Sequence, residues 1–341
     1  MAIRAGIGVV AALVAVAVTP GPVAAFSYPG YEYSYYMNTV NTTTLYNMGC
    51  SLGDAREGGS APQDGLVILD FGQPSHDTSK GYGAWAWSIG YVTVTQIRNA
   101  VVEFAHGFWW CTGANVTAHV RIGVGTTNFG NWTKNVGFTD SMVVAHAKAW
   151  ANMVNSINSD IASRGYQRQT DAVGAADIEV AWGTPTTARK WVDAYATVNL
   201  WPVYDFGDAA GCRQSGTIKT AGTCGYYTPD GGDTKYYWHQ NDLYYLTWQA
   251  LPAWGVPEIY REDAAQAKQW QQISKWATLN GLHADHFVGT LTQHGACVQK
   301  GCGGGLDNLP AEGWTQLRDK CAADAATALP GLRFASDIKW H

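Results

Sequence analysis

The stretch VGAADIEVAW, residues 173–182, decides how this chain folds and where its chemistry lies. Small and apolar residues lead into Asp177 and Glu179, whose side chains in a strand point to the same face about 7 Å apart. Ile178 and Val180 then point to the opposite face, where a helix would cover them. Carboxylates are costly to bury without a task or a partner, so the pattern predicts a buried strand that ends in a functional pair of acids. The structural alternative is that one acid caps the next helix and the other pairs with an arginine.

Short apolar runs alternate with amphipathic helical patterns from Gly65 onward, which predicts a parallel sheet covered by helices. The expected strands are 65–72, 119–128, 173–180, 201–207, 255–260 and 286–293, and the expected helices are 93–110, 141–165, 184–199, 262–280 and 311–327. Six such units favour an α/β fold of the TIM-like (β/α) barrel type, incomplete or irregular, over a doubly wound sheet. The sequence contains neither GxGxxG nor a P-loop that would support a nucleotide-binding fold.

The segments outside these units differ in composition. Residues 26–63 are rich in Tyr, Asn and Thr without a sustained period, so we expect an extended N-terminal arm that packs across a barrel domain of residues 64–341. A Gly-rich, cysteine-bracketed insertion is expected at 208–233. Residues 1–25 have a basic start, an apolar run and a small-residue end, as is typical of a signal peptide. We therefore expect a secreted protein with no membrane span after signal removal.

Charge and aromatic content limit the partners. The net charge is -5, only 14% of residues are charged and the chain has no basic cluster, which argues against nucleic acid and anionic membranes. The chain also has 16 Trp and 18 Tyr, more than core packing alone requires. Flat aromatic faces in an exported protein suit stacking on sugar rings, so a polysaccharide or peptidoglycan glycan is the expected partner of a monomer.

Seven cysteines in an exported chain favour disulfides with one cysteine left over. Two pairs are local in sequence, Cys212 with Cys224 and Cys297 with Cys302. Cys50 with Cys111 is the natural third pair, which leaves Cys321 free. Spacing alone does not settle the connectivity, because Cys321 could replace either member of the 297/302 pair. The spacings match no zinc module, and no metal or organic cofactor is expected.

Catalytic groups of β/α barrels stand at the C-terminal ends of strands, and four predicted strands end in acids. These acids are Asp70, the pair Asp177 and Glu179, Asp205, and Glu258. Acids that converge from several strands repel one another, which raises pKa values and suits a proton donor. The alternative for Asp70 and Asp205 is a cap or turn role, and for Glu258 a hydrogen bond to a neighbour.

Other side chains near these strand ends are candidates for substrate contact. Tyr260 shares a face with Glu258, and Gln293 ends the sixth predicted strand. Three tryptophans flank strands that carry a candidate acid, so we expect them to stack on sugar rings: Trp182, Trp201 and Trp254.

The order of these motifs resembles the lysozyme-like glycoside hydrolase family 25 and related secreted barrels. The resemblance rests on Asp70 at the end of the first predicted strand, on Asp177-Ile178-Glu179 before a Trp, and on Pro-Glu-Ile-Tyr at 257–260. It implies that Glu179 is the proton donor, that Asp177 orients the substrate or assists an acetamido group, and that Asp70 and Asp205 support them. The chain departs from that family in having one predicted βα unit fewer before the D-x-E.

These observations lead to a secreted glycoside hydrolase that cleaves a cell-wall or environmental polysaccharide by carboxyl acid/base catalysis. A non-catalytic glycan-binding or cell-envelope protein on the same barrel is the alternative, since a fold does not fix a function. A metal-dependent hydrolase of ester or amide bonds is a third hypothesis, although no ligand set is visible in the sequence.

Overall fold

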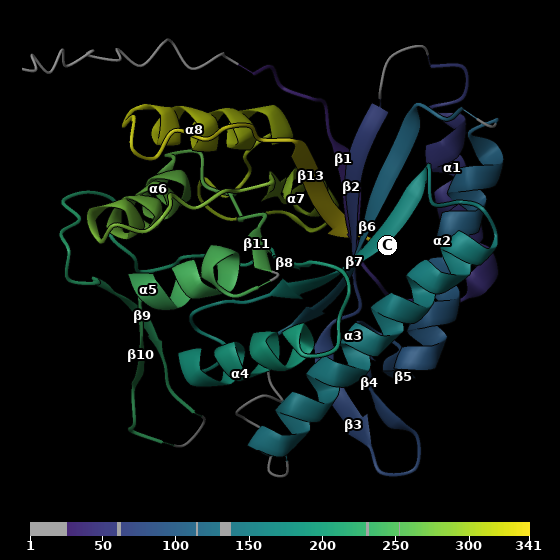
Figure 1. The fold of residues 1–341 in the computed structure, drawn as a ribbon, viewed down its shortest axis with the longest axis horizontal. Helices are drawn as coiled ribbons and strands as arrows, with labels where there is room; N and C mark the ends of the chain where they lie inside the picture. The colour runs from purple at the N-terminus through teal and green to yellow at the C-terminus, as the bar shows by residue number, and fades with distance from the viewer. Residues whose placement is uncertain (1–25, 60–62, 114, 130–137, 230–231, 252) are drawn as a thin grey trace, which may run out of the picture.

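Eight parallel strands form the centre of the fold in the computed structural model (Figure 1). The structure describes residues 26–59, 63–113, 115–129, 138–229, 232–251 and 253–341, so the signal peptide expected at 1–25 lies outside the described residues. The strand order is β11-β8-β7-β6-β2-β1-β13-β12. The bounds are β1 Glu32–Tyr36, β2 Gln63–Asp70, β6 Ala118–Thr127, β7 Thr170–Asp177, β8 Val203–Asp205, β11 Ala253–Gly255, β12 Gly289–Thr292 and β13 Phe334–Trp340.

The two edges of this sheet meet, which confirms the predicted α/β barrel. Beyond β11, Glu258 forms a parallel bridge with Leu291 of β12. The Ile259 N–H donates to the Leu291 carbonyl at 2.8 Å, and the Leu291 N–H donates to the Pro257 carbonyl at 3.0 Å. The barrel closes through these few hydrogen bonds between the segment after β11 and strand β12. The barrel is irregular at this junction, which we call the seam.

Helices cover the outside of the barrel, and most barrel strands are followed in the chain by one of these helices. Their bounds are α1 Thr42–Asp54, α2 Val94–Cys111, α3 Asp140–Ser163, α4 Pro185–Ala196, α5 Gln240–Tyr244 with the π-helix Tyr245–Gln249, α6 Ala265–Leu279, α7 His294–Lys300 and α8 Pro310–Ala322. Thr93, Thr139 and Thr184 begin α2, α3 and α4 as N-caps, each accepting a backbone N–H from three residues further on. None of the helices in the described segments has the length and apolar character needed to cross a bilayer.

Strand β7 shows how the sequence pattern positions the site. Val173 and Ala175 belong to the apolar cluster that fills the barrel interior. Ile178 and Val180 belong to the cluster between the sheet and the helices, as the alternation predicted. Asp177 therefore follows the inward-facing residues of β7 and stands at the C-terminal mouth of the barrel.

The expected N-terminal arm at 26–63 is wrong, because this segment supplies the first barrel strand and helix. β1 pairs with β13 and with β2. Its central inward position is Ser34, which hydrogen bonds to Ser336 at 2.6 Å and accepts the Ile68 N–H at 2.7 Å. A polar residue at that position hides the apolar alternation by which a strand is recognised.

Helix α1 escapes the sequence pattern for a different reason. Gly49 and Gly53, which weaken a helix by their flexibility, lie against α2. A Cβ at Gly49 would stand 2.0 Å from the Phe104 carbonyl oxygen, so only glycine allows this close approach. The Cys50–Cys111 disulfide joins the same two helices. Tertiary packing therefore overrides the local propensity of this segment.

The predicted disulfides are all present. Cys50 pairs with Cys111, Cys212 with Cys224 and Cys297 with Cys302, and Cys321 is free and buried. Such bonds persist in oxidising compartments, which agrees with an exported protein.

Two antiparallel additions extend the loops that follow β2 and β8, and the sequence predicted neither. The first contains β3 Gln73–Asp77, β4 Gly81–Ala86 and β5 Gly90–Thr93, and the second contains β9 Thr223–Tyr227 and β10 Tyr236–His239. Both lie toward the lower edge of the view in Figure 1. Because loops after barrel strands surround the C-terminal mouth, these additions belong to the end of the barrel that carries the acids.

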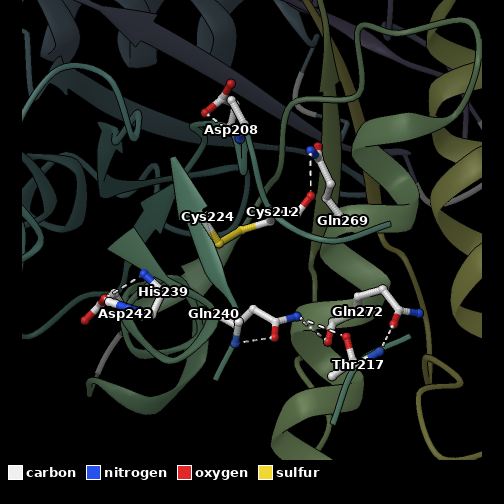
Figure 2. Close-up of a disulfide and its surroundings, with 11 residues drawn as sticks. Asp208, Cys212, Thr217, Cys224, His239, Gln240, Asp242, Gln269 and Gln272 are labelled. Atoms are coloured by element: carbon white, nitrogen blue, oxygen red, sulfur yellow. Dashed lines mark hydrogen bonds and ion pairs between the residues drawn. A yellow bond between two sulfur atoms is a disulfide. The ribbon is translucent and has the colours of Figure 1, made fainter. Parts of the chain in front are cut away.

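The second addition is fastened to α6 by buried amides (Figure 2). The Gln240 side chain donates to Thr217 Oγ1 and to the Gln272 carbonyl, and Gln272 Oε1 accepts the Thr217 N–H at 3.1 Å. Gln269 donates to the Cys212 carbonyl, next to the disulfide. The predicted insertion at 208–233 is therefore an ordered part of the barrel wall in its described residues.

Candidate active site

A pocket of about 380 Å³ opens at the C-terminal mouth of the barrel, next to the seam. Its walls come from β1, from the loop between β4 and β5, from the ends of β7 and β12, from the segment after β11, and from α7 and β13. The lining residues are Tyr36, Trp87, Asp177, Glu179, Trp182, Glu258, Tyr260, Gln293, Ala296, Lys300, Gly301, Cys302 and Trp340.

Three carboxyl groups converge in this pocket. One oxygen of each of Asp177, Glu179 and Glu258 lies within 4.8 Å of the others. Asp177 and Glu258 are only 2% and 4% exposed. Glu258 Oε1 accepts the Tyr260 hydroxyl at 2.7 Å, whereas Asp177 Oδ1 is buried without a hydrogen-bond partner in the described chain. The structural alternative, in which one of the two acids Asp177 and Glu179 pairs with an arginine, is not found among the described residues.

The backbone of Glu179 is fixed by one amide side chain. Asn128, which is fully buried just after β6, accepts the Glu179 N–H at 3.0 Å and donates to the Glu179 carbonyl at 2.9 Å. The Asn128 N–H also donates to the Asp177 carbonyl at 2.9 Å. β7 ends at Asp177, so these bonds replace the strand ladder and hold Glu179 in place beyond it.

Burial and mutual repulsion raise the pKa of every acid in the cluster. Burial, followed by the charge of Asp208, raises the pKa of Glu179 to about 8. Burial raises the pKa of Asp177 well above its ordinary value, and the charges of Glu258 and Glu179 raise it further. Burial and the charge of Glu179 do the same to the pKa of Glu258. Three carboxyls this close together do not all ionise near neutral pH, so the cluster holds protons that it can donate.

Asp70 and Asp205 lie at strand ends as predicted, but they do not line the pocket. Each accepts the N–H of the glycine two residues further on, Gly72 at 2.9 Å and Gly207 at 3.1 Å. The turn-forming alternative is therefore present in both. Burial raises the pKa of Asp70 to about 6 and that of Asp205 to about 8, and both charges act on Asp177.

The predicted substrate contacts divide into two groups. Trp182, Glu258, Tyr260 and Gln293 line the pocket, and Trp182 packs edge-on against Phe129 at 5.3 Å between ring centres. Trp201 and Trp254 do not line it. Trp201 precedes β8 and packs against the core between the sheet and the helices.

Trp254 belongs to β11, four residues before Glu258, and packs edge-on against Trp248 at 5.0 Å. It also lies against the barrel interior. Proximity in sequence to an acid-bearing strand is therefore a poor guide, because only the C-terminal end of a strand reaches the mouth.

The sequence analysis missed several residues that line the pocket or act on its acids, and five of them bear on its chemistry. Asp208 follows β8 and raises the pKa of Glu179. Tyr36 and Trp340 belong to strands that were not predicted, and Trp87 and Lys300 belong to the loop after β4 and to α7. The alternation in FASDIKW at 334–340 could have revealed β13 and with it Trp340.

Among the described residues, the oxygens of Asp177, Glu179 and Glu258 lie close enough together to hold a hard cation. A second group, Cys50, Asp54 and Cys111, offers no thiolate pair because its two sulfurs form a disulfide. Three oxygens are fewer than the six to eight that Ca²⁺ takes in proteins, so water or substrate would have to complete such a site.

Comparison of the chain with protein-family models, with curated proteins and with solved structures gives no match. The resemblance to glycoside hydrolase family 25 therefore rests on the sequence motifs and their places in the barrel.

Proposed function

We propose that this chain is a secreted glycoside hydrolase in which Glu179 donates the proton and Asp177 acts as its partner. The observation that carries the proposal is the cluster of Asp177, Glu179 and Glu258 within 4.8 Å, in a pocket that also presents tryptophan and tyrosine rings. Glycosidic bond cleavage uses two nearby carboxyls, of which one is protonated and the other is ionised, and a cluster that cannot ionise completely supplies both forms. Partly exposed aromatic rings beside them suit sugar rings.

In this mechanism the protonated Glu179 carboxyl delivers its proton to the leaving glycosidic oxygen. As the glycosidic C–O bond breaks, the ionised form of Asp177 stabilises the positive charge at the anomeric carbon, either directly or through an acetamido group of the substrate. Water then adds to the anomeric carbon and returns its proton to Glu179. Glu258, held by the Tyr260 hydroxyl, accepts a hydrogen bond from a sugar hydroxyl.

The strand count also supports the resemblance on which these roles rest. Because β1 and α1 are part of the barrel, the D-x-E ends the fourth barrel strand in chain order and not the third. The unit that the sequence appeared to lack before the D-x-E is therefore the segment 32–54.

The test is release of reducing sugar from peptidoglycan, chitin and plant and bacterial polysaccharides by the wild type and by Glu179→Gln. We expect release by the wild type and a loss of about 10²–10⁴-fold in the variant, which is the usual contribution of a general acid. Glu262→Gln, an exposed glutamate outside the pocket, is the matched control and should keep full activity.

Each assay is repeated with a chelator, and we expect equal release because the proposed step uses carboxyl protons. Activity that disappears with the chelator would indicate a cation at the carboxyl cluster. Wild-type protein that binds glycan without any release would support the non-catalytic alternative. Equal release by Glu179→Gln and wild type would exclude Glu179 as the donor.

A further inference from the structure

One part of the pocket wall combines aromatic rings with a positive charge. Lys300, the last residue of α7, places its ammonium 3.1 Å from the centre of the Trp340 ring. Trp340 packs against Tyr36 and Trp87, with ring centres 4.7 and 5.6 Å away. All four residues line the pocket that contains the carboxyl cluster. A ligand that enters the pocket therefore meets three aromatic rings, with a cation over one of them.

This wall is fixed before any ligand arrives. The side chain of Gln299 holds the main chain of Trp340 from both sides, donating to its carbonyl at 2.8 Å and accepting its N–H at 2.7 Å. The Cys297–Cys302 disulfide closes the turn that follows Lys300. A preformed wall loses little conformational entropy on binding, which is a feature of recognition surfaces.

The charge of Lys300 has no counterpart in the described part of the pocket wall. It is the only Lys or Arg among the lining residues, and its described interaction is with the Trp340 ring and with no carboxylate. Asp177, Glu179 and Glu258 line the same pocket, but no ion pair joins any of them to Lys300 among the described residues. A neutral sugar that covered this wall would desolvate the ammonium without supplying a partner.

We propose that Tyr36, Trp87, Trp340 and Lys300 form a subsite for a sugar ring that carries an anionic group, so that the substrate is an acidic polysaccharide. The inference rests on the proposed function, since it names the substrate of the same pocket. The rings pack on the apolar face of the sugar, and the ammonium pairs with its carboxylate, sulfate or phosphate group.

The experiment measures binding and not turnover. Glu179→Gln serves as the background, and isothermal titration gives the dissociation constants of uronic-acid, sulfated and neutral oligosaccharides of equal length. We expect at least one acidic class to bind about ten-fold more tightly than the neutral class, with affinity that falls as salt rises. The class that binds most tightly identifies the anionic group.

Lys300→Gln in the same background should remove this preference, and Lys300→Arg should retain most of it. Lys235→Gln is the matched control, because Lys235 also lies over an aromatic ring, 4.3 Å from the centre of Tyr226, but outside the pocket. It should leave the preference unchanged.

The inference is overturned by equal binding of acidic and neutral oligosaccharides, by an unchanged preference in Lys300→Gln, or by the absence of acidic binding. Neutral binding alone would leave the proposed hydrolase intact, because hydrolysis is judged separately with Glu179. Conversely, a failed hydrolysis assay together with Lys300-dependent acidic binding would leave the subsite and remove the activity.

Discussion

The same barrel strands carry acids at both ends. The acids at the N-terminal ends have cationic partners and, within the described part of the chain, those at the C-terminal mouth do not. Near the N-terminal ends of β2 and β7, Asp64 and Asp171 face Arg121 and His119 of β6. Arg121 donates two bonds to Asp171, at 2.7 and 2.8 Å, and His119 lies 2.8 Å from Asp64. At the C-terminal mouth, the carboxyl cluster has no arginine or histidine among the residues that line its pocket.

The pKa values follow this difference in partners. Burial alone would raise the pKa of Asp171, but hydrogen bonds from Arg121 and His119 lower it to about 2. Burial, with the charge of Asp208, raises the pKa of Glu179 to about 8. Both acids are largely buried, so the neighbouring charge decides the direction. The N-terminal end pairs its acids with cations, whereas the acids at the mouth repel one another.

The largest expected effect is on stability, and its sign differs between the two ends. Asp171→Asn leaves the charge of Arg121 partly buried without its bidentate partner, so we expect a loss of about 3 kcal/mol in the free energy of unfolding. Asp177→Asn removes an acid from a repelling cluster, so we expect no loss or a gain of up to about 1 kcal/mol. Urea unfolding at pH 7, followed by circular dichroism, measures both.

Matched losses in these two variants would contradict the comparison, because they would mean that Asp177 is as well satisfied as Asp171. Asp263→Asn is a suitable reference, since Asp263 pairs with Arg261 at the exposed surface. Such exposed pairs contribute at most about 1 kcal/mol.

The second effect is a pH dependence that the mouth produces. The pKa of Glu179 is raised in the folded state. Between about pH 4.5 and pH 8, the folded protein therefore keeps a proton on Glu179 that the unfolded chain has already lost. Its contribution to stability is full below that interval and is lost as pH rises through it. Glu179→Gln should therefore reduce the drop in unfolding free energy between pH 5 and pH 8 by about 3 kcal/mol.

Asp171 changes the stability with the opposite sign and in a different pH interval, because its pKa is lowered in the folded state. Its stabilisation is present above about pH 4 and is lost as pH falls toward 2. Urea titrations at several pH values separate the two intervals. An identical pH profile for the wild type and Glu179→Gln would show that Glu179 is ionised throughout.

The sequence predicted the elements whose side chains alternate cleanly, and it failed where packing replaces that alternation. β7 follows the rule, because Val173, Ala175 and Asp177 share one face of a strand. β1 was hidden by Ser34, and α1 by glycines that touch α2. No rule of composition distinguishes such glycines from those of a loop.

The candidate site was predictable to the extent that strand ends could be located. Asp177, Glu179, Glu258, Tyr260 and Gln293 come together as strand-end residues should. The aromatic and cationic wall was missed, because it depends on β1, β13 and α7, of which only β13 has a readable alternation. The sequence also does not show which acid pairs with a cation. Arg121 pairs with Asp171 and not with Asp177, although the two acids are only about six residues apart in the chain.

The smallest expected effect tests whether the ion pairs at the N-terminal end of the barrel stabilise the fold according to their burial or according to how many there are. Arg333 also contacts Asp64, but its side chain is 58% exposed, whereas that of Arg121 is 20% exposed. Arg333→Gln should cost at most about 0.5 kcal/mol, because water screens the pair and His119 still faces Asp64. Arg121→Gln should cost about 3 kcal/mol, because it leaves Asp171 without its bidentate partner. Urea unfolding at pH 7 gives both values, and equal costs would mean that the charges at this end act as one network in which exposure does not matter.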